Sequence, residues 1–212
     1  MTHPVLPLFP LPLVLFPGQR LPLHIFEPRY RAMIADCRAA VTAAGTPAPF
    51  GVILGRDTHL LGRIGCAAVI EQILREHDDG CLDLVARGDG RFRVLAVHED
   101  KSYLTGSVEP VPDEAEAVDP VLVTRVGSLY GRLAALVAEE VGVAPEGAPP
   151  ARAFELGQAA GLTVDLRQHL LEIPSENRRL EFLRLHLEGL LPALEERAEE
   201  RRRVRSNGRP RA

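Results

Sequence analysis

The sequence predicts an α+β protein with a small β-barrel in its first half and helices in its second half. Up to about Val111, short apolar runs are separated by Pro, Gly and Asp-Gly. From about Asp119 onward, long stretches have helical spacing and few breaking residues. The Pro-rich, acidic residues 110–116 between them are typical of a linker. We therefore expect a β-barrel subdomain over residues 1–112, a helical subdomain over 113–204 and an Arg-rich flexible tail over 205–212.

The strands of the first half are indicated by their apolar patterns. Apolar residues alternate with other residues over 82–87 and 91–94, which predicts half-buried strands. Asp-Gly occurs at 79–80 and again at 89–90, and this dipeptide favours turns between antiparallel strands, so we expect two successive hairpins. The short, irregular spacing of all the predicted strands favours a small barrel over a βαβ sheet. Further strands are expected over Leu11–Phe16, Leu21–Ile25, Phe50–Leu54, Ala67–Leu74 and Tyr103–Glu109.

Helical spacing appears once in the first half and repeatedly in the second. One helix is predicted to begin at Pro28 and reach Val41, with apolar residues at three- and four-residue steps. Asp119 and Pro120 are typical of a helix start, and Gly142 of the end of that helix. The remaining helices are expected over 151–160, over 165–173, and after a capping Ser175, with a kink or an end at Pro192.

Composition and charge exclude several classes of protein. The 212 residues have an ordinary globular composition, and the formal net charge of −4 argues against wholesale nucleic-acid binding. The apolar run Val5–Phe16 is broken by prolines, so no segment of membrane-spanning length is expected. The first eleven residues carry no Lys or Arg, so we also expect no signal peptide. Cys37, Cys66 and Cys81 are an odd number without CxxC spacing. We therefore expect no disulfide framework and a reducing, cytoplasmic compartment.

Known catalytic motifs are missing from the sequence. There is no GxxxxGK[ST] and no GxSxG, and residues 88–90 lack a dinucleotide fingerprint because Arg93 replaces its third glycine. Lys101 and Ser102 are adjacent, so on a strand they point to opposite faces. Residues 77–79, His-Asp-Asp, lie in an expected turn, where polar residues are common. We expect no catalytic residue, no metal site and no cofactor.

The most distinctive stretch runs from Leu6 to Arg31 and is rich in proline. Glu27 and Pro28 end a strand and begin a helix, which places a carboxylate near the positive helix start. His24, Glu27, Arg29 and Arg31 are interpreted as a local polar network that fixes this junction, since buried polar groups need partners.

This stretch resembles the substrate-binding domain at the N-terminus of Lon proteases, and above all the free-standing bacterial proteins built from that domain alone. The phrase His-Ile-Phe-Glu-Pro-Arg-Tyr-Arg, residues 24–31, is the most specific part of the resemblance. The resemblance extends from Pro4 to about Arg203. Further similar blocks are residues 50–54, 65–70, 88–95, 165–171 and 177–187.

The resemblance implies a PUA-like pseudo-β-barrel followed by a helical lobe. In full-length Lon the equivalent module helps to capture unfolded or tagged polypeptides, and an ATPase and a Ser/Lys protease follow it. The resemblance therefore implies a non-catalytic protein-binding module that recognises exposed or unfolded polypeptide segments. It also implies an adaptor or regulator role in proteolysis, with a protease or a chaperone as a further partner.

Three hypotheses remain open at this point. In the first, Phe16, Leu21, Phe26 and Tyr30 contact a bound polypeptide, because large side chains beside proline breaks need not all fit inside a barrel; the alternative role for each is core packing. In the second, the protein is a PUA-like nucleic-acid-binding protein that uses its Arg-rich tail. In the third, it is a small-ligand sensor or enzyme.

The third hypothesis needs a cleft between the two subdomains. Its candidate residues are His24, Glu27, Arg29 and Arg91, because convergence of polar side chains in a cleft is the usual sign of a ligand site. The sequence leaves the oligomeric state open.

Overall fold

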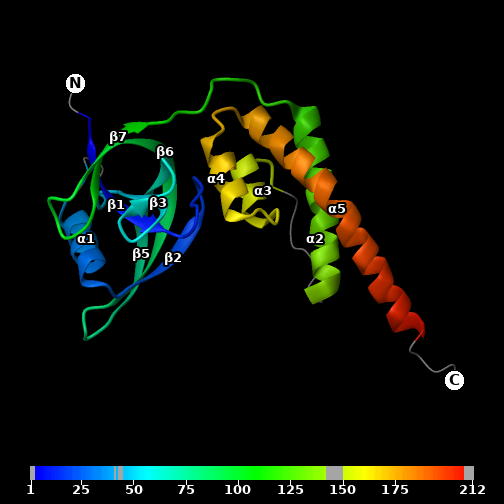
Figure 1. The fold of residues 1–212 in the computed structure, drawn as a ribbon, viewed down its shortest axis with the longest axis horizontal. Coiled ribbons are helices and arrows are strands. Elements are labelled where there is room, and N and C mark those ends of the chain that lie inside the picture. The colour runs from blue at the N-terminus through cyan, green and yellow to red at the C-terminus, as the bar shows by residue number, and fades with distance from the viewer. Residues whose placement is uncertain (1–2, 41, 43–44, 142–149, 208–212) are drawn as a thin grey trace. The chain divides into compact units, whose positions relative to one another are not determined.

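The computed structural model describes residues 3–40, 42, 45–141 and 150–207 of the chain (Figure 1). The chain divides into two compact units. The first unit comprises residues 1–114 and 162–174, and the second comprises residues 115–161 and 175–212. Residues 162–174 thus cluster with the strands, although they lie in the range for which the sequence predicts the helical subdomain.

The first unit is built on one mixed sheet. Its hydrogen-bonded order is β1-β7-β6-β5-β3-β4, and β2 pairs with β6. Because β1 also pairs in parallel with β3, the series of paired strands closes on itself. The strands fill the first half of the chain and most helices the second, which confirms the predicted α+β class. The strands are β1 (Val5–Leu11), β2 (Arg20–Ile25), β3 (Phe50–Arg56), β4 (His59–Leu60), β5 (Ile64–Glu76), β6 (Leu82–His98) and β7 (Thr105–Pro110).

One predicted hairpin is present and the other is wrong. Gly80 has a φ of 82° and lies in the turn between β5 and β6, as the Asp-Gly pattern predicts. The second Asp-Gly pair lies inside β6, which continues without a turn. Gly88 serves a close approach instead: its N–H donates to the Gln19 carbonyl over 2.9 Å, and a Cβ added there would lie 2.2 Å from the Phe16 oxygen.

The strand predicted over Leu11–Phe16 is also wrong, because β1 ends at Leu11. Pro12 has no N–H to offer a neighbouring strand, so the ladder stops there. Residues 14–16 nevertheless bury their side chains in the first unit. The other predicted strands are present with ends shifted by a few residues.

Helix α1 (Pro28–Ala39) begins where the sequence predicts and packs into the larger apolar cluster of the first unit. The helix ends at Ala39, and its predicted end, residue 41, lies outside the described residues. Tyr30, Met33 and Ile34 are buried in this cluster, and the Tyr30 ring centroid lies 4.2 Å from that of Phe9. The helix start is therefore held firmly against β1.

Helix α4 (Val164–Glu172) is bonded to the strands by side chains. The Gln168 amide donates to the Ile64 carbonyl over 3.0 Å. The Arg167 guanidinium donates to the Val14 carbonyl over 3.1 Å and lies 4.5 Å from the centre of the Phe16 ring. These contacts explain why α4 clusters with the first unit.

The second unit contains α2 (Pro120–Val141), α3 (Ala153–Ala159) and α5 (Glu176–Asn207). The Asp119 carboxylate accepts from the Val121 N–H over 2.8 Å, and the Ser175 hydroxyl accepts from the Arg178 N–H over 3.1 Å, so both predicted caps are confirmed. Gly142 lies outside the described residues.

Helix α5 does not end at Pro192, which lies inside it. Proline removes one backbone hydrogen bond, but the apolar seam of this helix is buried on both sides of that position, as Leu191 and Ala198 show. The helix reaches Asn207, so the predicted tail begins as helical backbone, and residues 208–212 lie outside the described residues.

By length and composition α2 could cross a membrane, contrary to the expectation that no such segment exists. Salt bridges between α2 and α5 are instead typical of helices that meet water along one side. Arg132 contacts Glu195 at 2.6 Å, and Arg125 contacts Glu188 at 2.8 Å. We therefore interpret α2 as one half of a helix pair.

Candidate functional site

A groove opens in the first unit where β2 gives way to α1. Its volume is ≈ 240 Å³, and its walls are mostly apolar. The ring of Phe26 lies in this groove and is 59% exposed, although most large apolar side chains of the unit are buried. The lining residues are Phe9, Pro10, Leu11, Pro12, Leu23, His24, Ile25, Phe26, Glu27, Arg29, Tyr30, Arg56 and Asp57.

The abrupt change from strand to helix leaves Phe26 exposed. β2 ends at Ile25, whose side chain is buried, and Pro28 already occupies the first turn of α1. The Glu27 carbonyl accepts from the Tyr30 and Arg31 N–H groups, which starts the helix. Phe26 is therefore held at a junction that both neighbouring elements fix.

Charged groups form the rim of the groove. The Arg29 Nε donates to the Glu27 carboxylate over 2.7 Å, and the same guanidinium lies 3.6 Å from Asp57. The Arg29 guanidinium also lies 4.6 Å from the centre of the Tyr30 ring. Burial raises the pKa of Tyr30, so its hydroxyl stays protonated. Asp57 has a φ of 55°, which Asp tolerates in a tight turn.

The structure brings two of the four predicted polypeptide contacts to the groove. Phe26 and Tyr30 both line it, although Tyr30 is only 6% exposed. Phe16 is fully buried beneath Arg167, and Leu21 is buried in the larger apolar cluster. Phe16 and Leu21 thus pack in the core, the role given above as the alternative to contact with a bound polypeptide.

Three of the four predicted polar residues line the same groove, and the fourth does not. His24, Glu27 and Arg29 are at the groove. Arg91 is buried elsewhere in the first unit, where its guanidinium donates to the Leu171 carbonyl over 2.8 Å and to the Asp113 carboxylate over 2.6 Å. Arg91 therefore holds the chain around α4 and does not join the polar rim.

Several groove residues are not apparent from the sequence pattern. Asp57 and Arg56 lie at the β3–β4 turn, far along the chain from Phe26. Pro10 and Pro12 form one wall of the groove. The only local indication of this in the sequence is that prolines at a strand end have no N–H to donate to a neighbouring strand.

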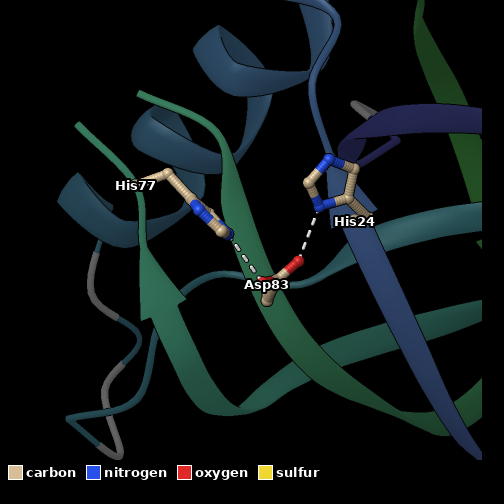
Figure 2. A group of neighbouring side chains, drawn as sticks. All are labelled: His24, His77 and Asp83. Atoms are coloured by element: carbon tan, nitrogen blue, oxygen red, sulfur yellow. Dashed lines mark hydrogen bonds and ion pairs between the residues drawn. The ribbon is translucent and has the colours of Figure 1, made fainter. Parts of the chain in front are cut away.

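A second polar group lies beside the groove and involves long-range pairing (Figure 2). His24 in β2 is the cross-strand partner of Asp83 in β6, and their Nδ1 and Oδ1 atoms are 2.6 Å apart. The other Asp83 oxygen lies 2.7 Å from His77 Nε2. Hydrogen bonds from the two histidines lower the pKa of Asp83, so its carboxylate is ionised and accepts from both rings. The sequence associates His77 with its neighbours in the turn, whereas the fold brings it to Asp83 and His24.

Comparison with known proteins gives a consistent result. Residues 5–189 match the family described as the ATP-dependent protease La (LON) substrate-binding domain. The chain is 32% identical over 184 residues to a Lon protease of Paraburkholderia phytofirmans, covering 82% of this chain and 22% of that protein. It is 30% identical over 186 residues to a Lon protease of Anaeromyxobacter dehalogenans, covering 82% and 20%. The chain thus spans about a fifth of the length of these relatives.

Two solved structures are similar over nearly their whole length. The Lon N-terminal domain protein from Xanthomonas campestris has a TM-score of 0.62 and 30% identity, covering 85% of this chain and 96% of that one. The N-terminal domain of the Mycobacterium avium complex Lon protease has a TM-score of 0.62, covers 89% and 100%, and supports the fold alone at 21% identity.

Proposed function

This chain belongs to the family of LON substrate-binding domains, and from that premise we propose that it binds exposed or unfolded polypeptide segments in the groove beside Phe26. The observation that carries the proposal is the 59% exposure of a phenylalanine inside a mostly apolar groove. Covering a Phe side chain fully contributes about 1.5–3 kcal/mol, so an apolar segment gains most by docking here.

The groove favours recognition by side chains over pairing of backbones. Pro10 and Pro12 lie in its wall and carry no N–H, so they cannot donate to an added strand. A bound chain would instead insert an apolar residue against Phe26, while the rim of Glu27, Arg29 and Asp57 contacts its polar backbone. Such a site selects for exposed apolar side chains and tolerates many sequences, as capture of unfolded chains requires.

We further propose that this chain does not itself catalyse a reaction. The groove lining contains no serine, threonine, cysteine or lysine. His24, whose Nδ1 is bonded to Asp83, therefore has no such nucleophile beside it in the lining to activate. These features support binding without bond cleavage.

The same proposal includes an adaptor or regulator role in proteolysis, in which the captured polypeptide is passed to a protease or a chaperone. It also includes a reducing, cytoplasmic setting, since the three cysteines are free thiols. Burial raises the pKa of Cys66 to about 12 and that of Cys37 to about 11, so both remain neutral thiols at physiological pH.

Replacing Phe26 with Ala is expected to weaken binding of a permanently unfolded polypeptide about tenfold, because a central aromatic contact carries much of an interface's free energy. Fluorescence anisotropy of a labelled, reduced and alkylated polypeptide measures the dissociation constant. Leu74→Ala is the matched control: Leu74 is 55% exposed in the same unit and does not line the groove. Equal affinity of the two variants, or no binding by the unaltered protein, would contradict the proposal.

A further inference from the structure

We propose that His24, His77 and Asp83 form a binding site for a divalent transition-metal cation of the zinc class. Figure 2 shows the two imidazole rings converging on the carboxylate. One donor atom from each residue lies within 4.8 Å of the other two. This site extends beyond polypeptide binding and does not depend on it.

The ligands come from three separate segments that backbone hydrogen bonds hold in place. His24 and Asp83 face each other across the β2–β6 ladder, so their side chains lie on the same side of the sheet. His77 follows β5 directly, and its N–H donates to the Cys81 carbonyl over 2.9 Å, while its own carbonyl accepts from Gly80 over 2.9 Å. The donors are therefore positioned before any ion arrives, which lowers the entropic cost of binding.

The distances suit insertion of an ion after a small adjustment. The two nitrogen-to-oxygen distances at Asp83 are 2.6 Å and 2.7 Å, both hydrogen-bond lengths. A tetrahedral zinc ion with ligands at about 2.0–2.2 Å separates neighbouring donors by roughly 3.3 Å. Moving each imidazole nitrogen away from the carboxylate by about 0.6–0.7 Å therefore makes room for the ion, which takes the place of the two hydrogen-bonded protons.

The donor set decides the class of ion. Neutral imidazole nitrogens favour zinc, copper and nickel, whereas Mg²⁺ and Ca²⁺ require oxygen ligands. One carboxylate and two imidazoles leave a bound dication with a charge of +1. The side chain of His24 is 56% exposed, so a fourth position stays open to water.

The neighbouring charges do not oppose a cation. Asp78 and Asp79 lie in the turn beside His77 and favour a cation, while the Arg31 guanidinium of α1 donates to the Asp79 carbonyl at the same turn. The Phe26 ring stacks on His24 with a centroid distance of 6.0 Å. This apolar ring shields one side of the site without filling it.

Titration of the metal-free protein with zinc chloride in an isothermal calorimeter tests the proposal. We expect one ion per chain, with affinity falling at least about tenfold in His77→Ala and in Asp83→Asn, the loss typical of removing a metal ligand or its orienting partner. His59→Ala is the matched control, because His59 is an exposed histidine of the same unit outside the cluster. Circular dichroism of each metal-free variant verifies that it is folded.

Cobalt(II) gives a second readout, since a tetrahedral site produces strong visible absorption that an octahedral aqueous ion lacks. Appearance of this absorption in the unaltered protein and in His59→Ala, with its loss in His77→Ala, supports the site. Zinc binding that persists in both His77→Ala and Asp83→Asn, or no binding below millimolar zinc, would show that the cluster only holds the strands together by hydrogen bonds. Polypeptide binding is measured separately through Phe26→Ala, which removes no ligand, so each proposal can fail alone.

Discussion

Replacing Arg91 with Met is expected to lower the free energy of unfolding of the first unit by about 3 kcal/mol, the upper end of the range for removing the hydrogen-bond partner of a buried polar group. Only 2% of the Arg91 side chain is exposed. Its guanidinium donates to the carbonyls of Leu171, Ile173 and Pro112 as well as to Asp113. A Met side chain fills similar space but leaves these acceptors without their donor.

The effect is measured by amide hydrogen exchange of β6, because a chain with two compact units need not unfold in one step. Arg93→Met is the matched control. Arg93 lies on the same strand, but 48% of its side chain is exposed and its partner is the surface carboxylate of Glu109. We expect that control to cost at most about 1 kcal/mol. Similar losses in the two variants would show that Arg91 does not hold α4 and the preceding chain together.

Gly88→Ala is expected to destabilise the first unit by about 3 kcal/mol, at the upper end of the range for overpacking. The added Cβ would lie 2.2 Å from the carbonyl oxygen of Phe16, a backbone atom that cannot move aside as the end of a flexible side chain could. The Gly88 N–H and carbonyl are bonded to Gln19 and Gly18 in the loop before β2, so β6 and this loop cannot move apart without breaking those bonds.

Gly90→Ala controls for the general cost of altering a glycine in β6. Nothing lies within 4 Å of a Cβ added at Gly90. Its free energy of unfolding should therefore stay within about 0.5 kcal/mol of the unaltered protein. Amide hydrogen exchange of β6 compares the two variants, and equal stability would contradict the close approach of Gly88 to Phe16.

Local patterns predict much of this fold because their causes are local. Pro28 starts a helix through its fixed φ, Ser175 caps one through its hydroxyl, and Gly80 permits a turn at positive φ. Asp89-Gly90 gives a wrong prediction because a local pattern takes no account of distant strands. The dipeptide favours a turn, but pairing of β6 with β2, β5 and β7 keeps this segment extended. The strand predicted over Leu11–Phe16 fails because Pro12 stops the ladder while the following apolar residues are still buried.

The residues of the candidate site also fall into those that a local pattern predicts and those that only distant parts of the chain bring together. Phe26 and Arg29 can be predicted because they flank a strand-to-helix junction that is visible in the sequence. Asp57 and Asp83 cannot, because only the strand register brings them to the groove and to His24. The core placement of Phe16 depends on α4, which supplies Arg167 from a distant part of the chain.

Amide hydrogen exchange in the presence of a saturating unfolded polypeptide tests the central claim most directly, because it locates the contact without altering any residue. Binding in the groove predicts slower exchange over residues 23–30, where β2 meets α1. The apolar face of α2 around Tyr130 and Val137 supplies the comparison within the same experiment, and its exchange should not change. Slower exchange confined to that face of α2, or no change at the groove under saturation, would contradict the account.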